Sequence, residues 1–114
     1  MRAEVTCEAL RLKPLRCVCG TIIDQVGEVV PRADVTILRD GTEIATVKTG
    51  IDGKFKLGEL KAGNYDLQAQ ATGFRLFSFP IVVENPAKKC KHPLEIILLA
   101  SGLETCTSIR LVKR

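Results

Sequence analysis

Turn residues recur at intervals of about ten between residues 15 and 99, and short runs of β-branched or apolar residues separate them. Aspartate and glycine tolerate the positive φ angles of tight hairpins, so Asp-Gly pairs mark sharp reversals of the chain. The turn signals, in chain order, are Asp24 to Gly27, Asp40-Gly41, Asp52-Gly53, Gly58, Gly63, Gly73 and Asn85-Pro86. This spacing is typical of an all-β sandwich and not of a helical or βαβ protein.

Seven strands are expected between these turns, and residues 105–112 are a candidate for a short final strand. The expected ranges are 15–23, 33–38, 43–48, 54–57, 64–71, 74–84 and 91–99. Side chains alternate along a strand, so Val18, Gly20 and Ile22 share one face and Cys17 and Cys19 share the other. The first strand therefore presents its two cysteines together, on the outward face.

The later strands carry their own positional signals. Tyr65, Leu67 and Ala69 alternate with polar residues and form the expected inward face of the fifth strand. Pro80 interrupts the sixth strand and lacks a backbone N–H, which predicts an edge strand or a bulge there. The range 91–99 is continuously apolar enough to be buried on both sides.

Residues 18–83 contain an ordered series of short motifs. Its members are Val18, Gly20, Ile22 and Asp24; Gly27 and Pro31; Ala33 and Val35; Asp52, Gly53 and Phe55; Gly63, Tyr65 and Leu67; and Gly73 and Phe74. In this order they resemble the carboxypeptidase regulatory-like family. The resemblance implies a seven-stranded antiparallel Greek-key sandwich of the transthyretin-like, or prealbumin-like, kind. It also implies a module that accompanies other domains in secreted or surface proteins.

The resemblance says little about function, because each matched position has a structural role in a turn or in the core. One departure is Gly50, where the family often has an acidic residue before Asp52-Gly53. A calcium ion needs several converging oxygen ligands, so calcium is not expected at this loop. No cofactor of any kind is expected.

The chain of 114 residues is the size of one domain. The expected domain spans 1–114, with a core at about 15–99 and extensions at 1–14 and 100–114. The longest apolar run, 96–100, is far shorter than the roughly 20 residues of a membrane span. No membrane segment is therefore expected.

Charge is divided unevenly along the sequence. Residues 17–85 carry seven Lys and Arg against nine Asp and Glu, whereas residues 1–16 and 86–114 together carry ten against four. The basic ends are read first as solvated termini and second as a patch that attracts an anionic polymer or surface. Nucleic acid is not an expected partner, since the four Phe and one Tyr are not interleaved with the basic residues.

Five cysteines lie at the two ends of the chain and none lies within residues 20–89. This placement suggests disulfides that tether terminal segments to the sandwich, which predicts a secreted, periplasmic or cell-surface protein whose signal peptide is absent from this sequence. An odd count leaves one thiol over. Cys17 and Cys19 are placed to pair with the N-terminal segment or with the C-terminal one, and the sequence does not choose. The disulfide candidates are Cys7, Cys17, Cys19, Cys90 and Cys106.

Cys17, Cys19, Cys90 and His92 form the first candidate site. If the first and last strands of the sandwich are neighbours, three sulfurs and an imidazole converge, and such a set can hold zinc. Disulfides are the favoured alternative, because structural zinc ligands usually sit on tighter knuckles. A Cys90 nucleophile with a His92 base is disfavoured, since an orienting carboxylate is suggested only at Glu95. No catalytic residue is therefore predicted.

Phe74, Phe77 and Phe79 form the second candidate site. Core packing is the first interpretation, and an exposed aromatic ledge for sugar rings is the alternative. Enzymes on related sandwiches need more: hydroxyisourate hydrolases use several histidines and a C-terminal Tyr-Arg-Gly-Ser motif, and intradiol dioxygenases hold iron with two tyrosines and two histidines. One His and one Tyr supply neither set.

The sequence as a whole predicts a non-catalytic extracellular or periplasmic module for protein interaction or structural support. The expected partner is another protein or a cell-surface polymer. A carbohydrate-binding module is the second hypothesis. A small metal-binding or redox domain built on the Cys/His cluster is the third.

Overall fold

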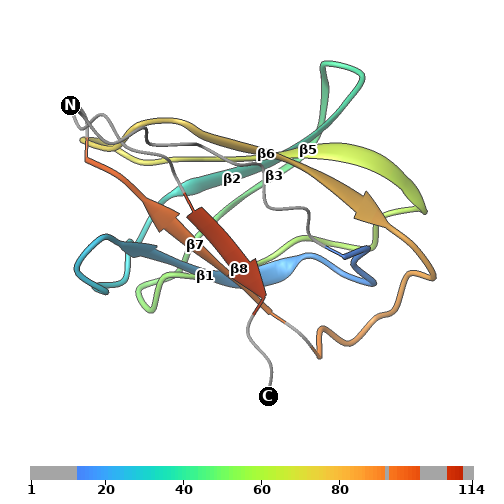
Figure 1. Cartoon of the computed structure of the whole chain (residues 1–114), viewed down its shortest axis with the longest axis horizontal. Coiled ribbons are helices and arrows are strands. Elements are labelled where there is room, and N and C mark those ends of the chain that lie inside the picture. The colour runs from blue at the N-terminus through green and yellow to red at the C-terminus, as the bar shows by residue number, and fades with distance from the viewer. Residues whose placement is uncertain (1–12, 92, 101–107, 112–114) are drawn as a thin grey trace, which may run out of the picture.

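The computed structural model describes residues 13–91, 93–100 and 108–111, and places eight strands in two sheets (Figure 1). Seven strands fall between residues 19 and 98, as expected, and the eighth confirms the candidate final strand. The strands are β1 (Cys19–Asp24), β2 (Asp34–Arg39), β3 (Thr42–Lys48), β4 (Lys54–Lys56), β5 (Gly63–Gln70), β6 (Phe77–Val83), β7 (Leu94–Leu98) and β8 (Ser108–Leu111). No helix in the described parts of the chain is long and apolar enough to cross a membrane.

The two sheets have four strands each, in the orders β4-β1-β7-β8 and β3-β2-β5-β6. The sandwich fold class is confirmed, with one local difference: β1 and β7 run parallel, whereas every other pair is antiparallel. The chain leaves one sheet after β6 and enters the other at β7, so the segment that begins at Glu84 and includes the described residues up to Lys91 crosses between the sheets. This crossing makes the first and seventh strands neighbours.

The core lies between the sheets and is filled mainly by buried residues of β1, β2, β4, β5, β6 and β7. Tyr65, Leu67 and Ala69 are 5%, 0% and 1% exposed, which confirms the predicted inward face of β5. Phe77 is the largest side chain with no exposed surface. The Tyr65 hydroxyl still finds a partner, because it donates to the carbonyl of Lys61 at 2.6 Å. The core is therefore apolar and its one phenol is satisfied.

The two Asp-Gly signals produce different turns. Asp40 and Gly41 have φ angles of 52° and 78° and join β2 to β3, as predicted for a tight hairpin. At the second signal only Gly53 has a positive φ, 73°, and its N–H donates to the carbonyl of Gly50. The second turn is thus a four-residue reversal with Gly53 at its end and Ile51 at its tip, and the prediction of a repeated two-residue hairpin was wrong.

Strand β6 is an edge strand, as Pro80 predicted. It begins at Phe77 and not at Phe74, because the chain before it makes other contacts. The N–H of Phe74 closes a turn on the carbonyl of Ala71, and the N–H of Arg75 donates to Leu99 at the other sheet. Similarly, β7 is shorter than predicted and begins at Leu94.

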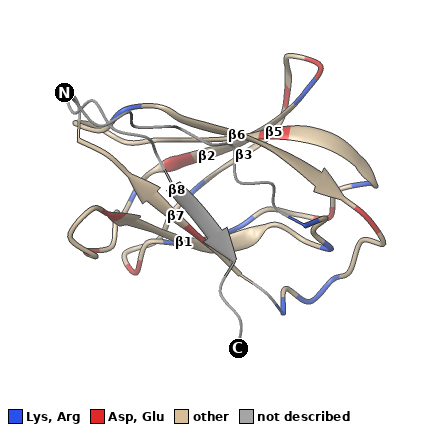
Figure 2. Ribbon diagram, in the orientation of Figure 1, with Lys and Arg blue, Asp and Glu red and all other residues tan. Residues whose placement is uncertain are grey.

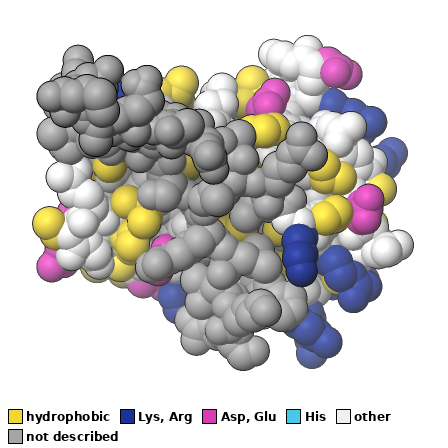
Figure 3. All heavy atoms as spheres, in the orientation of Figure 1, with side chains coloured by type: hydrophobic (Ala, Val, Ile, Leu, Met, Phe, Trp, Pro, Cys, Tyr) yellow, Lys and Arg dark blue, Asp and Glu magenta, His cyan; other side chains and the backbone are white. Residues whose placement is uncertain are grey.

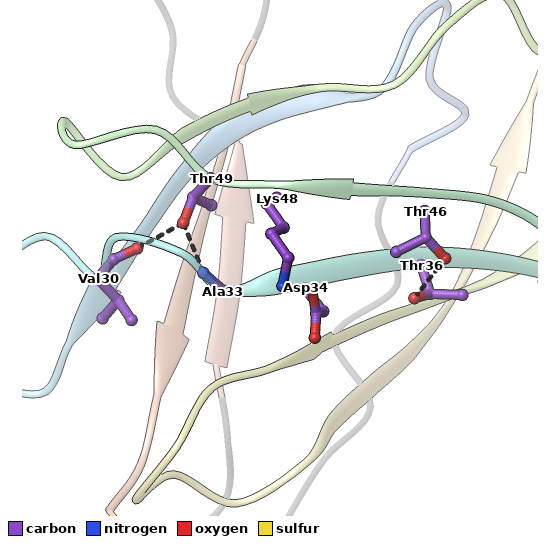
Figure 4. A network of polar contacts seen from close by, with 7 residues as sticks. All are labelled: Val30, Ala33, Asp34, Thr36, Thr46, Lys48 and Thr49. Carbon is purple, nitrogen blue, oxygen red and sulfur yellow. Dashed lines mark hydrogen bonds and ion pairs between the residues drawn. The ribbon is translucent and has the colours of Figure 1, made fainter.

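Thr49 is the one buried polar residue among those described, and it ties two turns together (Figure 4). Its hydroxyl donates to the carbonyl of Val30 and accepts from the N–H of Ala33, both at 2.8 Å. Both backbone groups are thereby satisfied at the point where the chain enters β2. The loop between β1 and β2 is consequently fastened to the end of β3.

Candidate functional site

Three cysteines from distant parts of the sequence meet beside the first sheet. Cys17 and Cys19 stand just before and at the start of β1, and Cys90 lies in the crossing segment before β7. The parallel pairing of Gly20 with Leu94 brings these two stretches side by side. The Sγ atoms of all three cysteines lie within 4.8 Å of one another, as predicted for neighbouring first and last strands.

Cys90 is the central member of this cluster. Its Sγ lies at bonding distance from the Sγ of Cys17 and also from the Sγ of Cys19. The Cα–Cα separations are 5.5 Å to Cys17 and 6.3 Å to Cys19, and both fall in the range of natural disulfides. A sulfur holds one disulfide at a time, so the cluster contains three sulfurs for one bond. Both candidate pairings are sterically available.

The three sulfurs differ in exposure. Cys19 is buried, with 9% of its surface exposed, and Cys17 and Cys90 are half-buried. The prediction that Cys19 faces outward was therefore wrong. Its strand neighbour β4 pairs with β1 at this level, with Cys19 opposite Lys56, and Cys90 approaches from the other side. The remaining candidates Cys7, Cys106 and His92 lie outside the described residues.

The crossing segment that carries Cys90 is fastened to the chain just before β1. The N–H of Ala87 donates to the carbonyl of Arg16 at 2.8 Å, and the Arg16 Nε donates to the carbonyl of Asn85 at 3.0 Å. Leu15 exchanges backbone hydrogen bonds with Val82 and Glu84. These contacts hold the two cysteine-bearing stretches in register independently of any sulfur bond.

A pocket of about 280 Å³ opens beside Cys17. Three of its lining residues, Arg16, Lys56 and Lys88, are basic, and Glu59 is its one acidic member. Figure 2 shows further basic positions along the segment between β6 and β7, and Figure 3 shows Lys and Arg side chains gathered at the same lower right corner. The sequence-based charge count placed basic residues after residue 86, and the structure brings some of them to the cysteines.

A second feature is the outer face of the β3-β2-β5-β6 sheet, which the sequence analysis did not single out. Lys48 Nζ lies 2.7 Å from the Asp34 carboxylate, and the hydroxyls of Thr36 and Thr46 lie 3.1 Å apart (Figure 4). Asp34 and the two threonines border an open hollow of about 390 Å³. Its lining residues are Asp34, Thr36, Leu38, Glu43, Thr46, Gln68, Ala69, Gln70 and Leu76. The signal in the sequence was the run of polar residues at alternate positions of these strands.

The phenylalanines do not form a three-ring platform. Phe77 is fully buried, and Phe74 and Phe79 are half-buried against the core. The rings of Phe77 and Phe79 are stacked with centroids 6.2 Å apart. The core-packing interpretation describes Phe77, and only Phe74 and Phe79 retain some surface for a ligand.

Comparison with known proteins agrees with this architecture. A family model of the carboxypeptidase regulatory-like domain matches residues 18–89, well over half of the chain. The chain belongs to this family. A solved structure of Klebsiella pneumoniae 5-hydroxyisourate hydrolase is similar to this carboxypeptidase regulatory-like domain, with a TM-score of 0.63 and 20% sequence identity over 85% of this chain and 99% of the hydrolase chain. No curated protein sequence matches.

At that identity the likeness to the hydrolase shows the fold alone, which is transthyretin-like. Cys19 lies inside the matched range of this carboxypeptidase regulatory-like domain, and Cys17 and Cys90 lie directly outside its two ends. The sulfur cluster therefore sits where the two ends of the family pattern meet. It lies at the seam between β1 and β7.

Proposed function

We propose that this carboxypeptidase regulatory-like domain is a non-catalytic module that works outside the cytoplasm and binds a protein partner. The observation that carries the proposal is an apolar surface at one end of the sandwich. Ile51 is 91% exposed, Val26 78% and Val29 43%, and all three lie on the loops that follow β1 and β3. We call these three residues the loop-end patch.

The two loops of the loop-end patch belong to one end of the molecule. The N–H of Ile22 donates to the carbonyl of Gly53, and a Cβ built on Gly53 would crowd the Val29 side chain. Figure 1 places the loop between β1 and β2 at the left end, and Figure 3 shows hydrophobic side chains exposed there.

The loop-end patch is also ordered by hydrogen bonds. The Asp24 carboxylate accepts the N–H groups of Val26 and Glu28 at 3.0 and 2.9 Å, as the turn role predicted for Asp24 requires. Apolar side chains held in a fixed arrangement lose little entropy when a partner covers them. A protein partner with a complementary apolar surface suits this end of the sandwich.

Site-specific photo-cross-linking tests the proposal. A photoreactive residue is placed at position 51 or 26, and at position 44 as the matched control, since Ile44 is 48% exposed but lies on β3, outside the loop-end patch. The expected result is one defined protein adduct from positions 51 and 26, lost when Val29→Asp is added, and none from position 44. Equal labelling from all three positions contradicts a specific partner.

The extracellular location is supported by the closeness of three sulfurs at disulfide separation. Mass spectrometry of the chain isolated from its natural source, alkylated with and without reductant, tests it. Protection of four of the five cysteines from alkylation in the absence of reductant, as in a chain with two disulfides, is the expected result. Complete alkylation without reductant argues for a reducing compartment.

A carbohydrate ligand is the second candidate, favoured by the hollow on the β3-β2-β5-β6 sheet. Thr36, Thr46, Gln68 and Gln70 supply neutral hydrogen-bonding groups around about 390 Å³ of open space. Sugar hydroxyls pair well with such groups. A glycan array decides between the candidates: binding that Gln68→Ala abolishes supports a sugar site, and the absence of any binding removes it.

A further inference from the structure

The cysteine cluster contains three sulfurs, one more than a single disulfide can use. Cys90 reaches two partners whose Cα atoms are both at disulfide separation, 5.5 and 6.3 Å. A backbone hydrogen bond between Ala87 and Arg16, before Cys90, and the pairing of Gly20 with Leu94, after it, hold the two cysteine-bearing stretches side by side whichever bond is made. Switching from one pairing to the other therefore requires little movement of the chain.

We propose that Cys17, Cys19 and Cys90 form a thiol–disulfide exchange centre, in which Cys90 is bonded in turn to Cys17 and to Cys19 and the third sulfur is a free thiol. This activity is separate from the loop-end patch, which lies at the other end of β1. It requires none of the residues outside the described ranges.

The internal exchange needs no oxidant. In the state with a Cys17–Cys90 bond, the Cys19 thiol loses its proton and its thiolate attacks the Cys90 sulfur. The Cys19–Cys90 bond forms, the Cys17–Cys90 bond breaks, and its electron pair leaves on Cys17, which takes up a proton. One thiol and one disulfide are present before and after, so the step is balanced. All three Sγ atoms lie within 4.8 Å of one another, so the attacking sulfur is close to its target in either state.

Unequal exposure gives the two states different properties. When Cys19 is bonded to Cys90, the free thiol is Cys17, which is half-buried and lines the 280 Å³ pocket. When Cys17 is bonded, the free thiol is Cys19, which is 9% exposed and shielded. The centre thus presents a reactive thiol in one state and conceals it in the other, because thiol reactivity requires access.

The pocket indicates the class of molecule that reacts with Cys17. Arg16, Lys56 and Lys88 outnumber Glu59 at its lining, so anionic molecules are attracted to it. A small anionic disulfide is the expected reactant. The Cys17 thiolate attacks one of its sulfurs, a mixed disulfide forms on Cys17, and the other half leaves as a thiolate.

The first experiment maps the bonds in the full chain without any substitution. Trypsin separates a peptide with Cys17 and Cys19, residues 17–32, from a peptide with Cys90, residues 90–91, and the peptides with Cys7 and Cys106 are distinct from both. After rapid acid quenching and alkylation, fragmentation between Cys17 and Cys19 shows which of them is linked to Cys90. We expect both linkages, each with the other cysteine alkylated.

Slow alkylation of the oxidised chain then tests exchange itself. If exchange is faster than alkylation, the label accumulates on Cys17 and the ratio of Cys19–Cys90 to Cys17–Cys90 linkages rises several-fold as the reaction proceeds. A ratio that stays constant overturns the proposal. A single fixed linkage overturns it as well, and so does a bond from the third cysteine to Cys7 or Cys106.

A soft metal ion is the competing occupant, since three thiolates also suit Cu(I) or zinc. The mapping experiment distinguishes the two. No linkage to Cys90, with all three cysteines alkylated only after a chelator has removed a stoichiometric metal, overturns the exchange centre in favour of a metal site.

The second experiment tests the pocket with glutathione disulfide as the probe. Lys56→Glu with Lys88→Glu should slow its reaction with Cys17 on the order of tenfold at low ionic strength. Lys61→Glu, an exposed lysine outside the pocket, is the matched control and should leave the rate unchanged. Neutral hydroxyethyl disulfide should react with all variants alike. An equal rate of glutathionylation in all variants overturns the charge-selective entrance.

Discussion

The centre of the sandwich and its cysteine-bearing seam are held together in different ways. In the centre, strand after strand buries alternate residues, and side chains such as Ile37 and Leu67 have no exposed surface. At the seam, the described residues 84–91 form no strand and are held by a few hydrogen bonds to Leu15 and Arg16 and by the sulfur cluster. Stability in the centre is shared among many contacts, whereas the seam depends on a small number of individual groups.

The largest expected effect comes from the centre. Phe77→Ala removes a ring that is 0% exposed and leaves a cavity, so it should lower the free energy of unfolding by about 4 kcal/mol. Ile44→Ala, at a position 48% exposed on β3, should change it by less than about 0.5 kcal/mol. Urea denaturation of both variants measures the difference. Similar losses for the two would show that the sheets are less closely packed than described.

The seam should show the next largest effect. Cys90→Ser removes both pairings and should cost about 3 kcal/mol under oxidising conditions, because the bond closes a long loop. Cys17→Ser and Cys19→Ser should each retain most of that stability, since one partner of Cys90 remains. In the presence of reductant, the unsubstituted chain and the three variants should have nearly the same free energy of unfolding. If one single variant is as unstable as Cys90→Ser, a single fixed bond is responsible.

A smaller effect is expected where the seam joins the centre. A Cβ at Gly20 would overlap the backbone carbonyl of Leu94, so Gly20→Ala must push β1 away from β7 and should cost about 2 kcal/mol. Gly58→Ala is the control, because a Cβ there meets nothing within 4 Å. Thermal unfolding compares the two. An unchanged midpoint for Gly20→Ala would contradict the close parallel pairing.

The smallest effect is expected on the outer sheet face. Lys48 and Asp34 lie 2.7 Å apart, but their side chains are 68% and 50% exposed, so water and salt screen the attraction. Lys48→Met should therefore change the free energy of unfolding by about 0.5 kcal/mol or less. The measurement is repeated at high salt, where any difference should shrink. A loss that persists at high salt would point to packing and not to charge.

The sequence was most informative where one residue type has one structural use. Pro80 predicted an edge strand, Asp40-Gly41 a hairpin and Asp24 a hydrogen-bonded turn, and all three are confirmed. At Asp52-Gly53 the prediction failed: the Gly53 N–H closes a turn on Gly50, and its carbonyl accepts from Ile22, which is distant in the sequence. Local chemistry determines the structure at Pro80, Asp40-Gly41 and Asp24, whereas tertiary contacts determine the turn at Asp52-Gly53.

The candidate site was only partly accessible from the sequence. The alternation of side chains along a strand predicted that Cys17 and Cys19 lie together. The assumption that the first and seventh strands are neighbours predicted that Cys90 lies close to them. The burial of Cys19 and the basic pocket were not foreseen, because β4 and the crossing segment contribute to them from other parts of the chain. A site formed at a seam depends on register, which spacing alone does not determine.

The parallel pairing of β1 with β7 also has a consequence for biosynthesis. During synthesis, β1 is complete long before Leu94 of β7 has been made. Cys17 and Cys19 are therefore present without Cys90 while the rest of the domain is synthesised. A chain that stops before residue 90 leaves both thiols without Cys90, whereas a complete chain bonds one of them to it. For a chain exported as proposed above, we predict that a version ended at residue 89 is retained as mixed disulfides while the full chain is released, which non-reducing electrophoresis would reveal. Equal release of both chains would contradict this. A disulfide to Cys90 then distinguishes a completely synthesised chain from an incomplete one.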